Sequence, residues 1–236
     1  MDPEKIQVNI TPRVETQTIL FGRASEPLPN PVAVKIGGNI DAPARFVEKR
    51  GKLIKADTAH VTVHRENPMY IALHIDETNP IYTEITGELS LDPDLLQFHV
   101  NANHLYTVKD LAALLRMRRI FFRDPDQHEK IMKNLAEFSV RTAVEFTEKD
   151  DRKGNAELLR KRASTVDLDF EFVLQIPIYK GFGVKTFRVE ILADVTDVGV
   201  KLWLESVELA ELLTKERDLI FAVQLDALKD FVIIEQ

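Results

Sequence analysis

Three of the six histidines lie in a segment where their side chains could meet, and neutral imidazoles held close together bind transition metals. Apolar and polar residues alternate on both sides of an Asn-Pro dipeptide, which predicts a hairpin. If Val63 pairs with Ile71, then His60 lies opposite His74 on the face away from the core. No carboxylate stands at an obvious ligand spacing. We therefore expect a solvated sheet face without metal, with His60 and His74 as the candidate ligands.

A row of carboxylates offers the chemistry of Mg²⁺ binding, which supports phosphoryl transfer. Asp167, Asp169 and Glu171 occupy alternate positions of one predicted strand, about 6.6 Å apart at a rise of about 3.3 Å per residue. The other side of this strand is strongly apolar, so we expect the acidic row to be its solvated side. The chain lacks a nuclease-like pairing of an acid with a Glu-x-Lys on the following strand, and a nuclease is not favoured.

Arginines gather on a predicted helix that begins at Thr107, and arginines on a helix face suit phosphate groups. The stretch from Arg116 to Arg123 contains four arginines and no acid. The candidate residues for nucleic-acid or phosphate contact are Lys109, Arg116, Arg119, Arg123, Arg160, Lys161 and Arg162. The alternative is a solvated face neutralised by neighbouring acids, and few aromatic rings accompany the arginines to stack on bases.

Other catalytic signatures are absent from the sequence. Zero cysteines exclude disulfide scaffolds, thiolate zinc sites, iron–sulfur clusters and a cysteine nucleophile. A predicted strand, not a helix, follows the run Gly181–Thr186, so this run does not match a phosphate loop. Neither a Gly-x-Ser-x-Gly elbow nor a dinucleotide-binding glycine motif occurs. We therefore expect a protein that is not an enzyme and holds no cofactor.

Short strands and one helix are predicted in the first half of the chain, which includes the histidine hairpin. Strands are expected at 32–36, in the histidine hairpin, at about 81–90 and at about 96–102. A short helix begins after Asp41 and ends at Gly51, which is expected to take the left-handed conformation.

The second half of the chain begins with helices and continues as a sheet. A capping box starts a helix at Thr107 that runs to about Phe122, and another helix starts after Asp124. Residues 139–165 mix strand-like and charged positions around an exposed loop. Three alternating runs after residue 168 predict an antiparallel meander, followed by a long helix with one apolar side. That side comprises Leu209, Leu212, Leu213, Leu219, Ile220, Val223 and Ala227. These elements define the α+β class: antiparallel meander sheets with packed amphipathic helices.

The two ends of the chain differ from its middle. Residues 1–31 are expected to form an extended arm with a proline linker, and residues 32–236 a single α+β domain, with a subdivision near 124–165 as the alternative. The apolar run near the C-terminus is too hydrophobic to stay in water, so it adds a strand, enters the core or docks on another subunit. The candidate oligomer contacts are Ile6, Val8, Ile10, Phe231, Val232, Ile233 and Ile234.

Composition sets broad limits on class and compartment. The chain has 236 residues, 44% of them hydrophobic and 29% charged, as in ordinary soluble domains. Its net charge of −7 does not attract phosphate backbones, although a local basic patch could. The N-terminus lacks the pattern of a signal peptide, and no apolar stretch reaches the roughly 18 residues of a membrane span. We therefore expect a cytoplasmic protein.

Several core and turn motifs follow one another along the chain. They are GNIDAPARF (38–46), YTVKDLAALL (106–115), DRKGN (151–155), FEF (170–172) with IPIYKG (176–181), and FRVE (187–190). Together they resemble the YfdQ-like family of bacteriophage and prophage proteins, over roughly residues 35–215 and without either chain end. The family has no assigned activity and no agreed catalytic residues, so the resemblance implies only a phage protein made in the cytoplasm of an infected bacterium.

Three functions follow as expectations. The first is a non-enzymatic phage accessory protein that assembles into a homo-oligomer. It is suggested by an arm at 1–30 that could pair with a sheet edge, by the apolar run 231–234 and by a long meander. The second is a nucleic-acid-binding factor of phage DNA metabolism that uses the predicted helix with Arg116–Arg123 and the cluster Arg160–Arg162. The third is an anti-defence protein that sequesters a nucleotide in an arginine-lined pocket between subunits. No membrane is expected among the partners.

Overall fold

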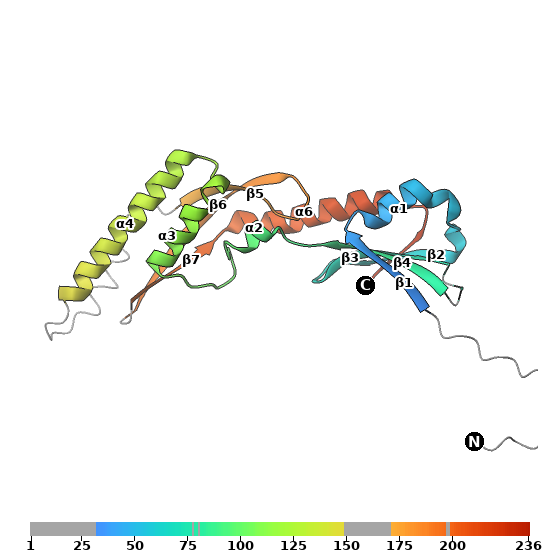
Figure 1. The fold of residues 1–236 in the computed structure, drawn as a ribbon, viewed down its shortest axis with the longest axis horizontal. Coiled ribbons are helices and arrows are strands. Elements are labelled where there is room, and N and C mark those ends of the chain that lie inside the picture. Colours follow the sequence, from blue (N-terminus) through green and yellow to red (C-terminus); the bar gives the residue numbers. More distant parts are fainter. Residues whose placement is uncertain (1–31, 77, 80, 149–170, 197–198) are drawn as a thin grey trace, which may run out of the picture.

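The computed structural model describes residues 32–148, 171–196 and 199–236, apart from residues 77 and 80. The molecule is elongated, with a five-stranded sheet at one end and a three-stranded sheet at the other (Figure 1). Helix α6 (Val207–Asp226) lies along both sheets. The sheets are mixed and antiparallel and are accompanied by helices throughout, which confirms the α+β class.

The five-stranded sheet has an antiparallel centre and parallel outer strands. Its strands, in spatial order, are β1 (Val32–Asn39), β4 (Ile81–Leu89), β3 (Met69–Ile75), β2 (Ala59–His64) and β8 (Val232–Glu235). β1 runs parallel to β4 and β8 runs parallel to β2. The apolar positions of the inner strands are buried beneath α6 and α1 (Ala42–Arg50). The sequence pattern predicts this centre but not the parallel outer strands.

The three-stranded sheet is the predicted antiparallel meander. Its strands, in order, are β5 (Glu171–Pro177), β6 (Val184–Thr196) and β7 (Gly199–Glu205). Two helices, α3 (Val108–Met117) and α4 (Pro125–Glu148), pack against it. Phe172 and Phe187 are fully buried on the packed face, so the alternate apolar positions form a core as the period of two predicts.

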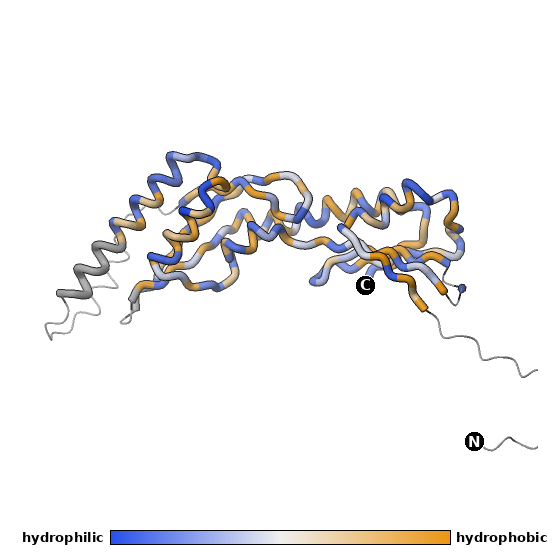
Figure 2. The backbone as a smooth tube through the Cα atoms, viewed as in Figure 1, coloured by the Kyte–Doolittle hydropathy of each residue, from blue (hydrophilic) through white to orange (hydrophobic). Residues whose placement is uncertain are grey.

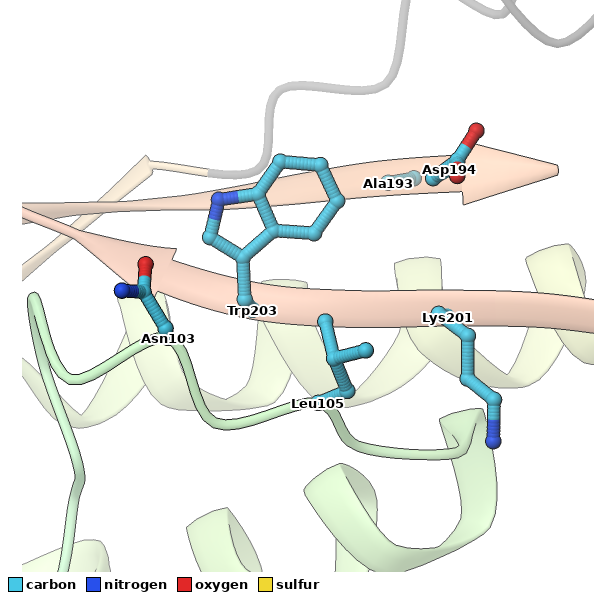
Figure 3. Close-up of a pocket in the computed structure, with 6 residues that line it drawn as sticks. All are labelled: Asn103, Leu105, Ala193, Asp194, Lys201 and Trp203. Atoms are coloured by element: carbon cyan, nitrogen blue, oxygen red, sulfur yellow. The ribbon is translucent and has the colours of Figure 1, made fainter.

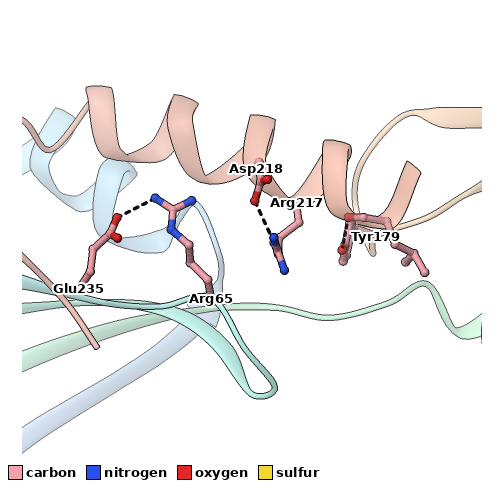
Figure 4. A network of polar contacts seen from close by, with 6 residues as sticks. Arg65, Tyr179, Arg217, Asp218 and Glu235 are labelled. Carbon is pink, nitrogen blue, oxygen red and sulfur yellow. Dashed lines mark hydrogen bonds and ion pairs between the residues drawn. The ribbon is translucent and has the colours of Figure 1, made fainter. Parts of the chain in front are cut away.

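Helix α6 joins the two sheets into one packed unit. Its N-terminal half lies on the three-stranded sheet, where the Tyr179 hydroxyl donates to the Leu213 carbonyl at 2.9 Å. Its C-terminal half lies on the five-stranded sheet, where the Arg65 guanidinium stands 5.2 Å from the centre of the Phe221 ring. Figure 4 shows Tyr179 and Arg65 at two different places along this helix. The apolar core is accordingly continuous from one sheet to the other.

Three helix boundaries differ from the sequence expectations. α3 ends at Met117 and not near Phe122, because Arg118 takes φ −108° and ψ 23° and a single 3₁₀ turn follows. α4 continues through the strand-like residues 140–146. Gly51 has φ −54°, in the right-handed region, so it continues into a 3₁₀ turn and is not a left-handed stop.

The strand predicted at 96–102 is wrong. The short helix α2 (Pro93–Leu96) and a series of turns occupy this stretch, with positive φ at His99 and Asn101. Asparagine tolerates this conformation better than most residues do. The Asn101 side chain also holds the start of α6, since it accepts from the Ser206 N–H and donates to the Ser206 carbonyl, both at 2.8 Å.

Candidate self-association surfaces

An exposed apolar strip lies along β1, where no further described strand pairs with its outer side. Val32, Val34 and Ile36 point to the same side of the sheet as the core, because Ile36 pairs with the buried Ile85. They remain 57%, 48% and 47% exposed, and Ile81 beside them on β4 is 63% exposed. Figure 2 shows the N-terminal part of β1 as hydrophobic. We call Val32, Val34, Ile36 and Ile81 the β1 strip.

The C-terminal run forms the opposite edge of the same sheet. Phe231 is buried, and the residues after it add strand β8, the first of the three placements predicted for this run. Arg65 binds the Glu235 carboxylate at 2.8 Å and so fixes the end of β8 (Figure 4). Three predicted contact residues keep 63%, 37% and 43% of their surface exposed: Val232, Ile233 and Ile234.

Helix α6 is apolar on two sides. Leu209 and Ile220 are buried on its inner side, as predicted. Leu219 and Val223 instead lie outside, 52% and 65% exposed, and Ala227 is exposed as well. The single apolar side predicted for this helix is therefore wrong: the residues of its last turns divide between the core and solvent.

The predicted histidine pair lies on the face of the five-stranded sheet that no described helix covers. His60 pairs with His74 and Val63 with Ile71, which confirms the predicted register. The two imidazoles stack with 4.5 Å between ring centres, and the Thr62 hydroxyl lies 3.1 Å from Nε2 of His74. An open cavity of about 670 Å³ follows this face. Among the described residues, no three metal-ligating side chains gather closely enough to hold an ion.

The predicted phosphate-contact residues do not share one helix face. Lys109 and Arg116 are exposed two turns apart on α3, whereas Arg119 belongs to the 3₁₀ turn and Arg123 follows it. The Arg119 guanidinium is 3.7 Å from the carboxylate of Glu129, and both groups are exposed. Lys109, Arg116 and Arg123 make no ion pair with a described residue. The structure therefore brings only part of this cluster together.

An open cavity of about 560 Å³, which the sequence did not predict, lies beside the only tryptophan (Figure 3). Trp203 lies on β7, and its indole N–H donates to the Glu205 carboxylate at 2.8 Å. Leu105, at the cavity wall, is 56% exposed. One acid and one base, Asp194 and Lys201, also line the cavity. The only sign of this cavity in the sequence was a single tryptophan at a solvent-facing position of a predicted strand.

Two buried tyrosines titrate above their ordinary range. Burial raises the pKa of Tyr106 to about 12. Burial also raises the pKa of Tyr179, although the positive charge of Arg217 opposes it. Their hydroxyls donate to backbone carbonyls, of Phe98 at 3.0 Å and of Leu213 at 2.9 Å. Both tyrosines thus remain neutral near pH 7 and connect elements of the fold.

Some of the contact and site residues predicted from the sequence lie outside the described residues. It comprises Ile6, Val8, Ile10, Arg160, Lys161, Arg162, Asp167, Asp169 and the arm and linker of residues 1–31.

Comparison with protein-family models, curated proteins and solved structures gave no match. The resemblance to the YfdQ-like family therefore remains a prediction. None of the described helices combines the length and apolar character needed to cross a bilayer. The candidate site rests on the exposed apolar surfaces of the β1 strip, β8 and the outer side of α6.

Proposed function

We propose that this protein is a non-enzymatic accessory protein of a bacteriophage or prophage that works in the bacterial cytoplasm by assembling with copies of itself. The observation that carries the proposal is that both outer strands of the five-stranded sheet, β1 and β8, present apolar side chains to solvent. An outer strand also offers unpaired N–H and C=O groups to another chain. The phage origin is supported only by the family resemblance.

The β1 strip is contiguous, which distinguishes it from the single exposed apolar residues of an ordinary surface. Val32 and Ile81 are paired neighbours on adjacent strands, and Val34 and Ile36 continue the row along β1. Removing such a surface from water gains about 25 cal/mol for each Å² buried. Association with another copy would supply that gain and complete the hydrogen bonding of the strand.

Replacing Val34 and Ile36 together by lysine should weaken self-association at least tenfold. The two ammonium groups would have to be desolvated at a contact that now buries apolar carbon. Sedimentation velocity over a concentration series measures the change. Both positions are about half exposed in the single chain, so folding should be preserved, and circular dichroism checks this.

The matched control is the pair Met117→Lys and Ile120→Lys. These side chains are 84% and 85% exposed and lie near the end of α3, outside the β1 strip. The control should associate like the unmodified protein. Equal weakening in both double variants would contradict the proposal, because it would show a general effect of added charge.

A second candidate function, contact with nucleic acid, is favoured by the exposed Lys109, Arg116 and Arg123, which make no ion pair with described residues. If this candidate is correct, replacing Arg116, Arg119 and Arg123 by alanine weakens DNA binding. The slope of the logarithm of the binding constant against the logarithm of the salt concentration should fall by the equivalent of up to about three phosphate contacts. Fluorescence anisotropy at low salt measures both quantities. Binding that is absent, or equal in protein and variant, excludes this candidate. The nucleotide-sequestering alternative requires an arginine-lined pocket between subunits and remains a prediction; no arginine lines either cavity described above.

A further inference from the structure

We infer that the occupant of the β1 edge is β1 of a second copy, paired antiparallel about a two-fold axis that passes beside Val34. The inference rests on the proposed self-assembly and specifies its surface, its partner and its register. Strand β1 is eight residues long and has an exposed apolar side, so it offers a second copy both backbone groups and apolar contact.

The segment able to pair is limited at both ends by the sequence. Prolines 27, 29 and 31 precede β1, and a proline has no N–H to donate to a neighbouring strand. Gly37 and Gly38 follow Ile36 and have no side chains to pack. The useful contact is therefore the segment Val32–Ile36.

Charge and size select one register within this segment. With Val34 opposite the same residue of the partner, Val32 faces Ile36 and Lys35 faces the small Ala33. A register centred on Lys35 would place two ammonium groups directly opposite each other, which is destabilising. A register centred on Ile36 would oppose Val34 to Gly38 and lose apolar contact. In the favoured register, Lys35 also keeps its ion pair with Glu84 at 3.2 Å.

The same register joins the two sheets without exchanging their faces. Opposed residues of antiparallel strands point to the same side, and Val34 opposite Val34 keeps the helix-covered sides of both copies together. The two β1 strips then form one apolar band across the junction. Such a two-fold contact uses the same patch on both copies, which is the commonest symmetry of soluble oligomers.

The other outer strand is a poorer partner for β1. β8 has four residues, and short strands are one way in which proteins protect sheet edges. Its last residue, Glu235, is already held by Arg65 at 2.8 Å. A contact of β1 with β8 would also be head-to-tail, and it would lead to rings or open filaments in place of a closed pair.

Disulfide trapping tests the register directly, because the full chain contains no cysteine. In a Val34→Cys variant the two introduced cysteines would face each other at a Cα separation of about 4.5–5.5 Å, within disulfide range. Mild oxidation should convert most of the chain to a species of twice 27.0 kDa on non-reducing gels. A mixture of Val32→Cys and Ile36→Cys should also cross-link, and neither should do so efficiently alone. Met117→Cys, exposed and outside the strip, is the control.

The outcomes separate this inference from the proposal on which it rests. If the unmodified protein is oligomeric but Val34→Cys cross-links no better than Met117→Cys, the register is wrong and self-assembly stands. Efficient cross-linking of Val34→Cys to Ile233→Cys, whose side chains share the helix-covered side of the sheet, without cross-linking of Val34→Cys to itself, replaces the two-fold contact by a head-to-tail one. A protein that is monomeric at every concentration overturns both.

Discussion

A Phe221→Ala variant should lose about 3–5 kcal/mol of unfolding free energy, the usual cost of removing a fully buried aromatic ring. Phe221 is 0% exposed and lies where the C-terminal half of α6 meets the five-stranded sheet. The guanidinium of Arg65 covers the ring and also binds Glu235. The cavity should therefore loosen β8 as well as α6.

Urea denaturation followed by two probes measures this effect. Trp203, the only tryptophan, lies in the three-stranded sheet and reports from the far end of the molecule. If α6 makes the two sheets one cooperative unit, the fluorescence and circular dichroism midpoints should fall together. Val223→Ala, two positions along and 65% exposed, should change stability by less than about 0.5 kcal/mol. An unchanged tryptophan transition in Phe221→Ala would show that the sheets unfold separately.

A Gly87→Ala variant should lose about 3 kcal/mol, at the upper end of the cost of overpacking, because the added methyl group would meet backbone atoms that cannot turn away. A Cβ at this position would lie 2.7 Å from the carbonyl oxygens of both Asn39 and Ile40. These residues connect β1 to α1. The substitution should displace β1 from β4 and, through β1, weaken self-association.

Gly37→Ala is the matched control, because a Cβ there would meet nothing within 4 Å. It lies on β1 itself, so it tests whether any added methyl group on this strand is harmful. Chemical denaturation should give Gly37→Ala nearly the stability of the unmodified chain. Equal stability of the two variants would contradict the close approach of β1 over Gly87.

Local patterns predicted the parts of the fold that depend on neighbouring residues. The hairpin register that brings His60 opposite His74 follows from the period of two, since a shift by one residue would expose the core side of both strands. The start of α3 follows from Thr107, whose hydroxyl accepts from the Asp110 N–H at 3.1 Å. Both features need only a few adjacent residues.

Features set by distant partners could not be predicted. The parallel pairing of β1 with β4 and of β8 with β2 depends on which strand each one reaches in three dimensions. The exposure of Leu219 on α6 also depends on distant partners, because an apolar residue is buried only where another element covers it. Nothing local marks the turns near Asn101 beyond their asparagines.

The β1 strip was overlooked for the same reason. The sequence predicts a strand at 32–36, and an apolar strand reads as a buried one until its position in the sheet is known. Its place at the edge of the sheet makes Val32, Val34 and Ile36 candidate contacts. The apolar character of the C-terminal run instead predicted contacts there, where Phe231 is buried and Val232, Ile233 and Ile234 are partly exposed.

The mass of the unmodified full-length protein in solution tests self-assembly most directly. Size-exclusion chromatography with multi-angle light scattering, at several micromolar concentrations and physiological salt, should give twice 27.0 kDa or a higher even multiple. The mass should fall toward that of one chain on dilution or in the Val34→Lys, Ile36→Lys variant. A constant mass of 27.0 kDa across the concentration range would contradict the proposed function.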